Sequence, residues 1–128
     1  MKRINWITAA FILILILIVI TANLGLGPDY FPFMYSVPGL DKVGHFVLMG
    51  ILAFLINLVL NLKKLRIFGQ DFLIGSMAVL LVVALEEFSQ LFLVFRAFSI
   101  LDLVFDLGGI LLGGKLACWY SGKREPGV

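Results

Sequence analysis

Charged residues and cysteines are scarce in this chain of 128 residues. Charged side chains make up 14% of the sequence and hydrophobic side chains 62%, whereas a soluble domain has about 25% charged residues. So few polar groups cannot cover a water-soluble domain of this length. The single cysteine, Cys118, excludes an internal disulfide and a cysteine-based zinc site. No basic patch of the kind that binds nucleic acid is present either. The composition indicates an integral membrane protein.

Four hydrophobic stretches are long enough to cross a bilayer, which takes roughly 20 apolar residues. They cover residues 4–22, 43–62, 72–93 and 100–120. The first is longer than the roughly 7–15-residue core of a signal peptide, which favours a permanent anchor. We therefore expect an all-α bundle of four transmembrane helices that forms a single domain over residues 1–128.

Basic residues near the ends of the expected spans gather on one side of the membrane. Eight of the ten lie on the side that holds both termini, and two lie on the other. The eight are Lys2, Arg3, Lys63, Lys64, Arg66, Lys115, Lys123 and Arg124, and the two are Lys42 and Arg96. Because short loops rich in lysine and arginine stay in the cytoplasm, this distribution predicts that both termini are cytoplasmic.

Most acidic residues and the only histidine lie at the outer ends of the expected spans. At ~1.5 Å per residue, Glu86 and Glu87 lie roughly 21–22 Å from the inner start of the third span. Asp106 lies about 9 Å below the outer start of the fourth, in a hydrocarbon core about 30 Å thick. An ionisable group in hydrocarbon costs about 2.5–3.5 kcal/mol, so such groups face a protein interior or a wet cleft and mark functional sites. We expect carboxylates from two helices to meet at one depth.

Helical spacing places these polar residues in pairs, each pair on one helix face. The pairs are Asp41 with His45, Glu87 with Gln90, and Asp102 with Asp106. Ser99 begins an S-x-x-D run typical of a helix N-cap. Asp41, which follows Pro38 and Gly39, predicts a similar cap for the second span.

Three chemistries fit this group of residues. In the first, Lys42 and Arg96 bind a phosphate or carboxylate group. The other ligand-binding candidates are Gln90, Asp41, Asp102 and Glu86. In the second, carboxylates that cannot all ionise supply acid–base catalysis, and the candidate catalytic residues are His45, Glu87 and Asp106.

The third chemistry is a divalent metal held by the same three side chains, His45, Glu87 and Asp106. No HExxH motif is present, and no cofactor is otherwise expected. A purely structural arrangement is the remaining alternative. In it the charges only pair, Arg96 with Asp102 and Lys42 with Glu86.

Small and amide residues predict how the spans pack. Gly109, Gly113 and Ala117 form a stripe that lets the fourth span approach another helix closely, either within the chain or in a homodimer. Asn57 and Asn61 share a face near the inner end of the second span, which predicts interhelical hydrogen bonds.

Two blocks of the sequence resemble the VanZ-like family of small bacterial membrane proteins. Residues 41–46, Asp-Lys-Val-Gly-His-Phe, are similar to the family's D-K-x-x-H-F block at the start of a span. The second block resembles the family's E-x-x-Q, R, D-x-x-x-N, G and G series. Its residues here are Glu87, Gln90, Arg96, Asp102, Asp106, Gly109 and Gly113. Asp106 stands where the family usually has asparagine, and a proline often found between the glutamine and the arginine is missing.

The resemblance implies a multi-pass protein of the bacterial cytoplasmic membrane. The member that names the family is linked to resistance against the glycopeptide teicoplanin, which points to envelope lipids or lipid-linked cell-wall precursors. We therefore expect an outer-face site that binds or modifies an anionic lipid of this kind and affects glycopeptide susceptibility. The long outer loop, residues 25–40, is expected to cover that site. The alternative is a non-catalytic membrane scaffold or partner-docking protein whose charged residues hold the helices together.

Overall fold

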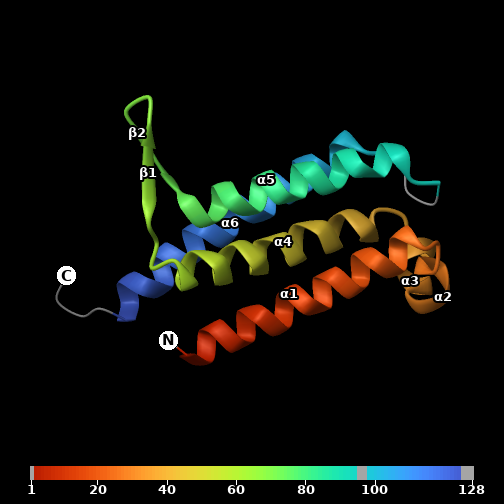
Figure 1. Ribbon diagram of the computed structural model, residues 1–128, viewed down its shortest axis with the longest axis horizontal. Coiled ribbons are helices and arrows are strands. Elements are labelled where there is room, and N and C mark those ends of the chain that lie inside the picture. The colour runs from red at the N-terminus through yellow and green to blue at the C-terminus, as the bar shows by residue number, and fades with distance from the viewer. Residues whose placement is uncertain (1, 95–97, 125–128) are drawn as a thin grey trace.

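The computed structural model describes residues 2–94 and 98–124, and most of these are helical. Along the chain come α1 (Lys2–Asn23), α2 (Gly27–Tyr30), α3 (Pro32–Ser36), α4 (Leu40–Val59), β1 (Lys64–Ile67), β2 (Gln70–Leu73), α5 (Ile74–Ser89), the 3₁₀ helix η1 (Gln90–Phe92) and α6 (Ile100–Arg124). The four long helices form an elongated bundle (Figure 1). The start of α1 and the end of α6 lie at the same end of it.

Three helices of the described part are long and apolar enough to cross a membrane. They run over Arg3–Asn23, Leu40–Val59 and Ile74–Phe92. This agrees with the first three expected spans to within a few residues. The fourth expected span corresponds to α6, which has 25 residues but is interrupted by Asp102, Asp106 and Lys115. It is not among the three.

The packing of α4 against α6 is the most extensive in the molecule. Two glycines of α6 make it close. A Cβ atom on Gly109 would overlap the carbonyl oxygen of Phe46, and one on Gly113 would overlap that of Gly50. Small residues let two backbones approach in this way, as the sequence predicts. The stripe is therefore occupied by α4 of the same chain.

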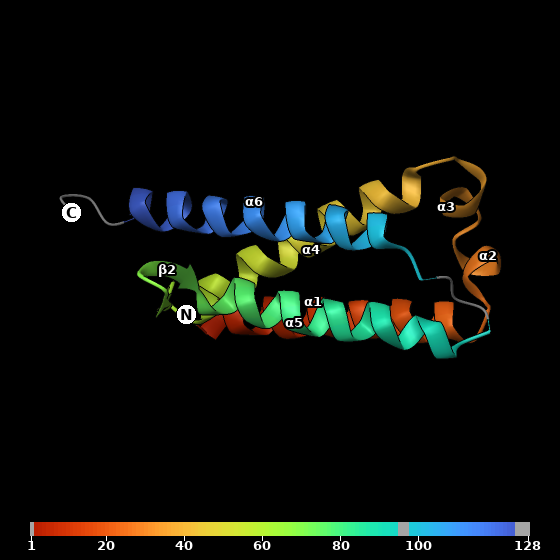
Figure 2. The ribbon, with the colours of Figure 1, turned by 90° about the horizontal axis from the view of Figure 1, so that it is seen from above.

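The apolar core lies where α4, α5 and α6 meet. Ala53, Val79, Val83 and Ile110 form it, one or two from each helix. Helix α1 runs along α4 at the edge of the bundle (Figures 1 and 2), and Thr8 is the one buried residue among its described side chains. Exposed apolar side chains around the bundle suit contact with lipid, since acyl chains are as apolar as leucine.

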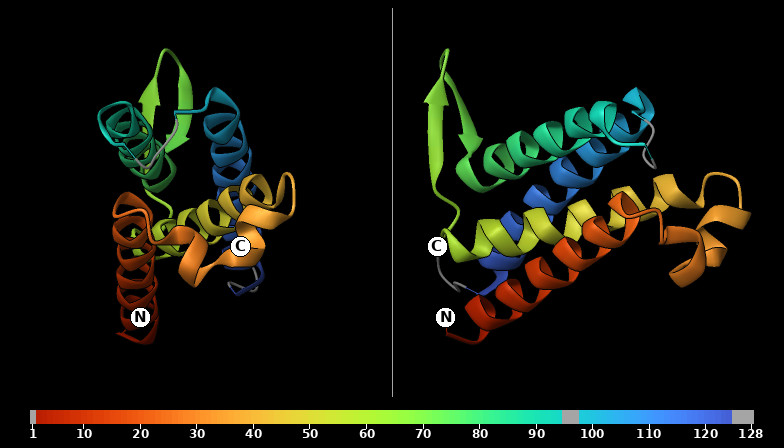
Figure 3. Two further views of the ribbon diagram at one scale, coloured as in Figure 1. Left: turned by 90° about the vertical axis from the view of Figure 1, so that its right-hand side faces the viewer. Right: turned by 45° about the vertical axis from the view of Figure 1, so that its right-hand side comes forward.

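The two ends of the bundle carry different connecting elements. At one end, α2 and α3 are short helices that each begin with a proline in the first turn. They lie on the side of α4 away from α5, and Met34 of α3 packs against Gly44 (Figure 3, left). The expected cover over the polar residues of α5 and α6 is therefore not formed by this segment. At the other end, β1 and β2 form an antiparallel hairpin where the sequence indicates only a short basic loop.

Candidate functional site

Three helices bring polar side chains together at the end of the bundle that carries α2 and α3. We call this set the polar cluster. It consists of Lys42 and His45 of α4, Glu86 and Glu87 of α5, Gln90 of η1, and Asp102 and Asp106 of α6. Helix α4 presents Lys42 and His45 to α6, while the four-residue spacing of Asp102 and Asp106 points both carboxylates back toward α4.

Most members of the polar cluster are buried between the helices. Glu87 is 0% exposed, Asp106 1%, Gln90 2% and Asp102 8%. The side chains of Lys42 and His45 are 26% and 27% exposed. Groups of this polarity therefore face the protein interior and not the lipid, as their cost in hydrocarbon requires.

Lys42 joins α4 to α6 through an ion pair with Asp102. Its Nζ atom donates to Oδ1 of Asp102 at 3.0 Å and lies 3.7 Å from Oδ2 of Asp41. The partner of Lys42 is thus Asp102, and not Glu86 as in the purely structural alternative. Asp41 is more than half exposed and lies at the edge of the polar cluster.

His45 lies between the two carboxylates of α6. Its Nδ1 atom is 2.9 Å from Oδ1 of Asp106, and its Nε2 atom is 3.9 Å from Oδ2 of Asp102. The short contact favours a proton on Nδ1, because the buried carboxylate is an acceptor. At 3.9 Å the other contact is too long for a hydrogen bond. Nε2 therefore faces the Asp102 carboxylate without a hydrogen bond to it.

Glu87 is held by donors from two sides. Its Oε1 atom accepts from the backbone N–H of Ser99 at 2.9 Å, and its Oε2 atom accepts from Nε2 of Gln90 at 3.1 Å. The same amide of Gln90 also donates to both oxygens of Glu86, at 3.2 and 3.1 Å. A carboxylate with two donors and full burial is fixed in position.

The start of α6 connects this carboxylate to the rest of the polar cluster. The hydroxyl of Ser99 accepts the backbone N–H of Asp102 at 3.4 Å, which confirms Ser99 as the N-cap. The corresponding expectation for Asp41 is wrong. Gly39, with φ 81°, is the N-cap of α4, and Asp41 lies inside the first turn. There its charge still favours the helix N-terminus.

The sequence missed one contact, the backbone N–H of Ser99 on Glu87. The sequence predicts Ser99 only as a cap, since a main-chain donor twelve residues away leaves no pattern in side-chain types. Arg96, expected to bind an anionic group, lies outside the described residues. The other expected members of the site, apart from Asp41, come together in the polar cluster.

A metal centre finds no support among the side chains described. Over residues 2–94 and 98–124, no three His, Cys, Asp or Glu side chains are grouped so that they could hold a metal ion. The ligand set that the sequence suggests is His45, Glu87 and Asp106. In the structure His45 and Asp106 instead pair with each other, and Glu87 accepts from Gln90 and Ser99.

A second polar contact lies toward the other end of the bundle. The Nδ2 atom of Asn57 donates to Oγ of Ser76 at 2.8 Å, and Asn57 is 0% exposed. Among the described residues its Oδ1 atom has no hydrogen-bond donor, and it occupies the space that a Cβ atom on Gly75 would need. The predicted interhelical hydrogen bond of Asn57 is thus confirmed, whereas Asn61 is exposed in the turn after α4.

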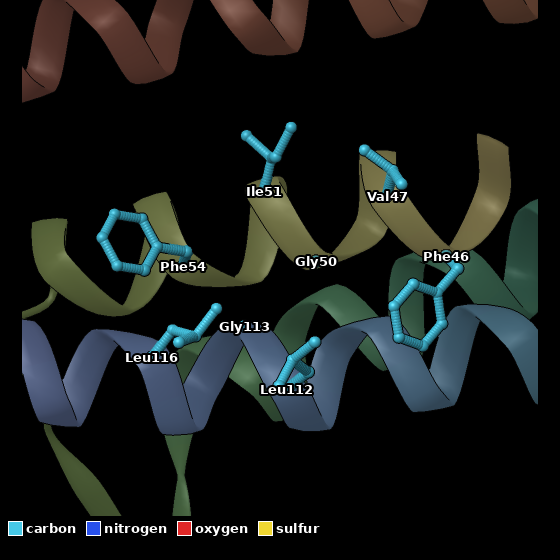
Figure 4. Close-up of a pocket in the computed structure, with 8 residues that line it drawn as sticks. All are labelled: Phe46, Val47, Gly50, Ile51, Phe54, Leu112, Gly113 and Leu116. Atoms are coloured by element: carbon cyan, nitrogen blue, oxygen red, sulfur yellow. The ribbon is translucent and has the colours of Figure 1, made fainter. Parts of the chain in front are cut away.

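An apolar groove of about 370 Å³ lies between α4 and α6. It is lined by Phe46, Val47, Gly50, Ile51, Phe54, Leu112, Gly113 and Leu116. Figure 4 shows Phe46 and Phe54 at its two ends. The groove begins at Phe46, the residue after His45 and one helical turn from Lys42. It has no polar lining and is suited to a hydrocarbon chain.

Comparison with protein-family models, with curated proteins and with solved structures finds no match for this chain.

Proposed function

We propose that the chain crosses the bacterial cytoplasmic membrane four times, with both termini in the cytoplasm. Helix α6 is the fourth span. At ~1.5 Å per residue, its 25 residues exceed the thickness of the hydrocarbon core. Its two carboxylates are covered by α4 and α5, and Lys115 is near enough to the inner end to extend to the surface. Eight of the ten basic residues then lie on the cytoplasmic side.

In this orientation the polar cluster faces the outer leaflet. We propose that it binds or modifies an anionic envelope lipid or a lipid-linked cell-wall intermediate. The observation that carries the proposal is the partly buried network of His45, Asp106, Asp102 and Lys42, which joins α4 to α6 within the proposed membrane spans. Ionisable groups are placed there at a cost, and that cost favours a functional role.

The geometry gives each residue of the network a distinct task. Asp106 orients the ring of His45 and leaves Nε2 to accept or deliver a proton, as in general acid–base catalysis. Lys42 directs its ammonium toward Asp102 and Asp41. An ammonium has three N–H donors, so one remains for a phosphate or carboxylate oxygen. Arg96 is proposed to bind the same anionic group.

The apolar groove supports a lipid as the ligand. Its lining begins one turn from Lys42, so a molecule with its headgroup at the polar cluster can extend a hydrocarbon chain along α4 and α6. The resemblance of residues 41–113 to VanZ-like proteins supports the same class of ligand. Membership of that family and an effect on glycopeptide susceptibility are parts of the proposal.

Native mass spectrometry of the protein released gently from membranes tests this function. We expect a bound anionic or polyprenyl-linked lipid in the wild type, lost in Lys42→Gln and in His45→Ala. Lys115→Gln is the matched control, because Lys115 is an exposed lysine near the other end of α6, and it should retain the lipid. A wild-type protein without lipid, or equal retention in all variants, would contradict the proposal.

One observation favours a second function, a scaffold whose charges hold the helices together. Each described side chain of the polar cluster has a partner, since Lys42 pairs with Asp102, His45 with Asp106, and Glu87 with Gln90 and Ser99. In that case the polar cluster needs no ligand, and the protein acts by docking a partner.

Glu87→Gln separates the two functions. The substitution keeps the side-chain volume but replaces one acceptor oxygen with a donor that faces the amide of Gln90. At an acid–base site it removes the carboxylate's charge, so we expect lipid binding or turnover to be lost while the folded protein still inserts. A scaffold predicts the reverse result. Thermal stability in detergent falls, and the set of bound lipids does not change.

A further inference from the structure

The hairpin of β1 and β2 links two membrane-spanning helices and runs across them. It connects the end of α4 to the start of α5, and it extends sideways from the bundle (Figures 1 and 3). Two backbone hydrogen bonds fix its base. The N–H of Leu62 donates to the carbonyl oxygen of Asn57 at 2.8 Å, and the N–H of Ile74 donates to the carbonyl oxygen of Lys63 at 2.9 Å.

Backbone conformation sets the direction of the hairpin. Asn61 and Leu62 both adopt the left-handed region, with φ 56° and 58°, and turn the chain away from the axis of α4. Because α4 and α5 span the membrane, an element that leaves them sideways lies along the membrane surface. A strand of four residues at about 3.3 Å each reaches roughly 13 Å from its base.

The register of the hairpin separates its side chains into two faces. Leu65 pairs with Phe72 and Ile67 with Gln70, so one face is mostly apolar. On the other face Arg66 pairs with Asp71, with 3.5 Å between Nε and Oδ1, and Lys64 lies beside them. Leu65 and Phe72 remain 47% and 42% exposed. On this face Leu65 and Phe72 are therefore exposed, whereas Ile67 is half-buried.

The tip of the hairpin carries a residue that folding alone does not favour. Phe68 and Gly69 have φ 51° and 78°, the two positive values of a type I′ turn. Asparagine, aspartate and glycine suit the first of these positions, and an aromatic residue there is strained. The side chain of Phe68 is also fully exposed. A strained, exposed aromatic side chain indicates contact with something outside the chain.

We propose that the hairpin docks on the anionic lipid surface at this end of the bundle. Phe68 and the apolar face enter the boundary between headgroups and acyl chains, and Lys63, Lys64 and Arg66 bind lipid phosphates. Asp71 offsets one of these three positive charges, so the hairpin stays basic and complements an anionic leaflet. Amphipathic elements with basic and aromatic residues bind membrane interfaces in this way. The docking site is at the opposite end from the polar cluster and does not depend on the function proposed for it.

Spin labels placed along β1 test the docking. In the full-length protein with Cys118→Ser, single substitutions Leu65→Cys, Arg66→Cys, Ile67→Cys and Phe68→Cys each receive a nitroxide. The protein is reconstituted in phosphatidylcholine vesicles with and without phosphatidylglycerol. Accessibility to oxygen reports lipid, and accessibility to a water-soluble nickel chelate reports water.

With phosphatidylglycerol we expect the ratio of oxygen to nickel accessibility to be several-fold higher at positions 65, 67 and 68 than at position 66. In phosphatidylcholine alone the difference should shrink. Two results would overturn the proposal. High nickel accessibility at all four positions would show a hairpin in water. Labels at 65 and 67 shielded from both reagents would show that protein covers this face.

A variant of the tip separates docking from folding of the hairpin. Phe68→Asn places a favoured residue in the turn, so the hairpin should persist while the label at position 65 loses most of its exposure to lipid. Phe68→Tyr, which keeps an aromatic ring suited to the interface, should restore that exposure. An unchanged label at position 65 in Phe68→Asn would overturn the role of Phe68.

Discussion

At the scale of single residues, Asp106 is the group on which the orientation of His45 depends. It is 1% exposed, and its Oδ1 atom is 2.9 Å from Nδ1 of the ring. Asp106→Leu removes the acceptor from the partly buried Nδ1–H of His45, and we expect it to lower the free energy of unfolding by about 1–3 kcal/mol. Asp106→Asn keeps an acceptor oxygen of the same size and should cost less. Unfolding by sodium dodecyl sulfate in mixed micelles measures both, and equal losses would contradict this role.

The sequence indicates which residues form the polar cluster better than it indicates their partners. An ionisable residue deep in an apolar run must be covered by protein, and this argument correctly selects Glu87 and Asp106. Which residues pair depends on how far each side chain reaches across the crossing of two helices. The spacing of residues along one helix does not predict this. Lys42 accordingly pairs with Asp102 and not with Glu86. Asp41 is exposed, although it lies four residues before His45 and is expected on the same helix face.

At the scale of secondary-structure elements, the crossing of α4 and α6 depends on glycine. A Cβ atom on Gly109 or Gly113 would overlap a carbonyl oxygen of α4, which cannot move without shifting the helix. We expect Gly109→Ala and Gly113→Ala each to lower the free energy of unfolding by about 1–3 kcal/mol, the usual cost of overpacking.

Gly122→Ala is the matched control on the same helix, since its added methyl group would meet no other described part of the chain within 4 Å beyond its own stretch of helix. There the substitution should be neutral or raise stability by roughly 0.5–1 kcal/mol, because alanine favours a helix. Unfolding in mixed micelles compares the three variants. Equal behaviour of Gly113→Ala and Gly122→Ala would show that the close approach of α4 and α6 does not limit stability.

Long elements were predictable from the sequence, and short ones were not. Runs of apolar residues locate α1, α4 and α5 because a helix is the form in which a backbone crosses hydrocarbon. The sequence does not predict the hairpin because its turn, Phe68-Gly69, lacks the asparagine or aspartate that usually precedes the glycine. The left-handed backbone of Leu62 likewise has no signal in the sequence. The helices α2 and α3 span only four and five residues, too few for a periodic pattern.

At the scale of the whole molecule, depth along the helices was the most useful quantity that the sequence supplied. Counting about 1.5 Å per residue puts Glu87 and Asp106 at one level, and the structure places both within one cluster. The count does not say which sides of the helices meet. That depends on the glycine contacts of α6 with α4, and these turn Asp102 and Asp106 toward α4.

The proposed topology makes a prediction about the two ends of the molecule. Tyr30 of α2 and Asp71 on the polar face of the hairpin are both exposed and lie at opposite ends of the bundle, so each can report one side of the membrane. In protein with Cys118→Ser, we expect a membrane-impermeant maleimide to label Tyr30→Cys on intact spheroplasts. Asp71→Cys should be labelled only after permeabilisation, since the basic residues beside it keep this end in the cytoplasm. Cys118→Ser alone is the blank. The reverse pattern would place the polar cluster at the inner leaflet and exclude outer-leaflet lipids as its ligands. Labelling of both positions on intact spheroplasts would show that α4 does not cross the membrane.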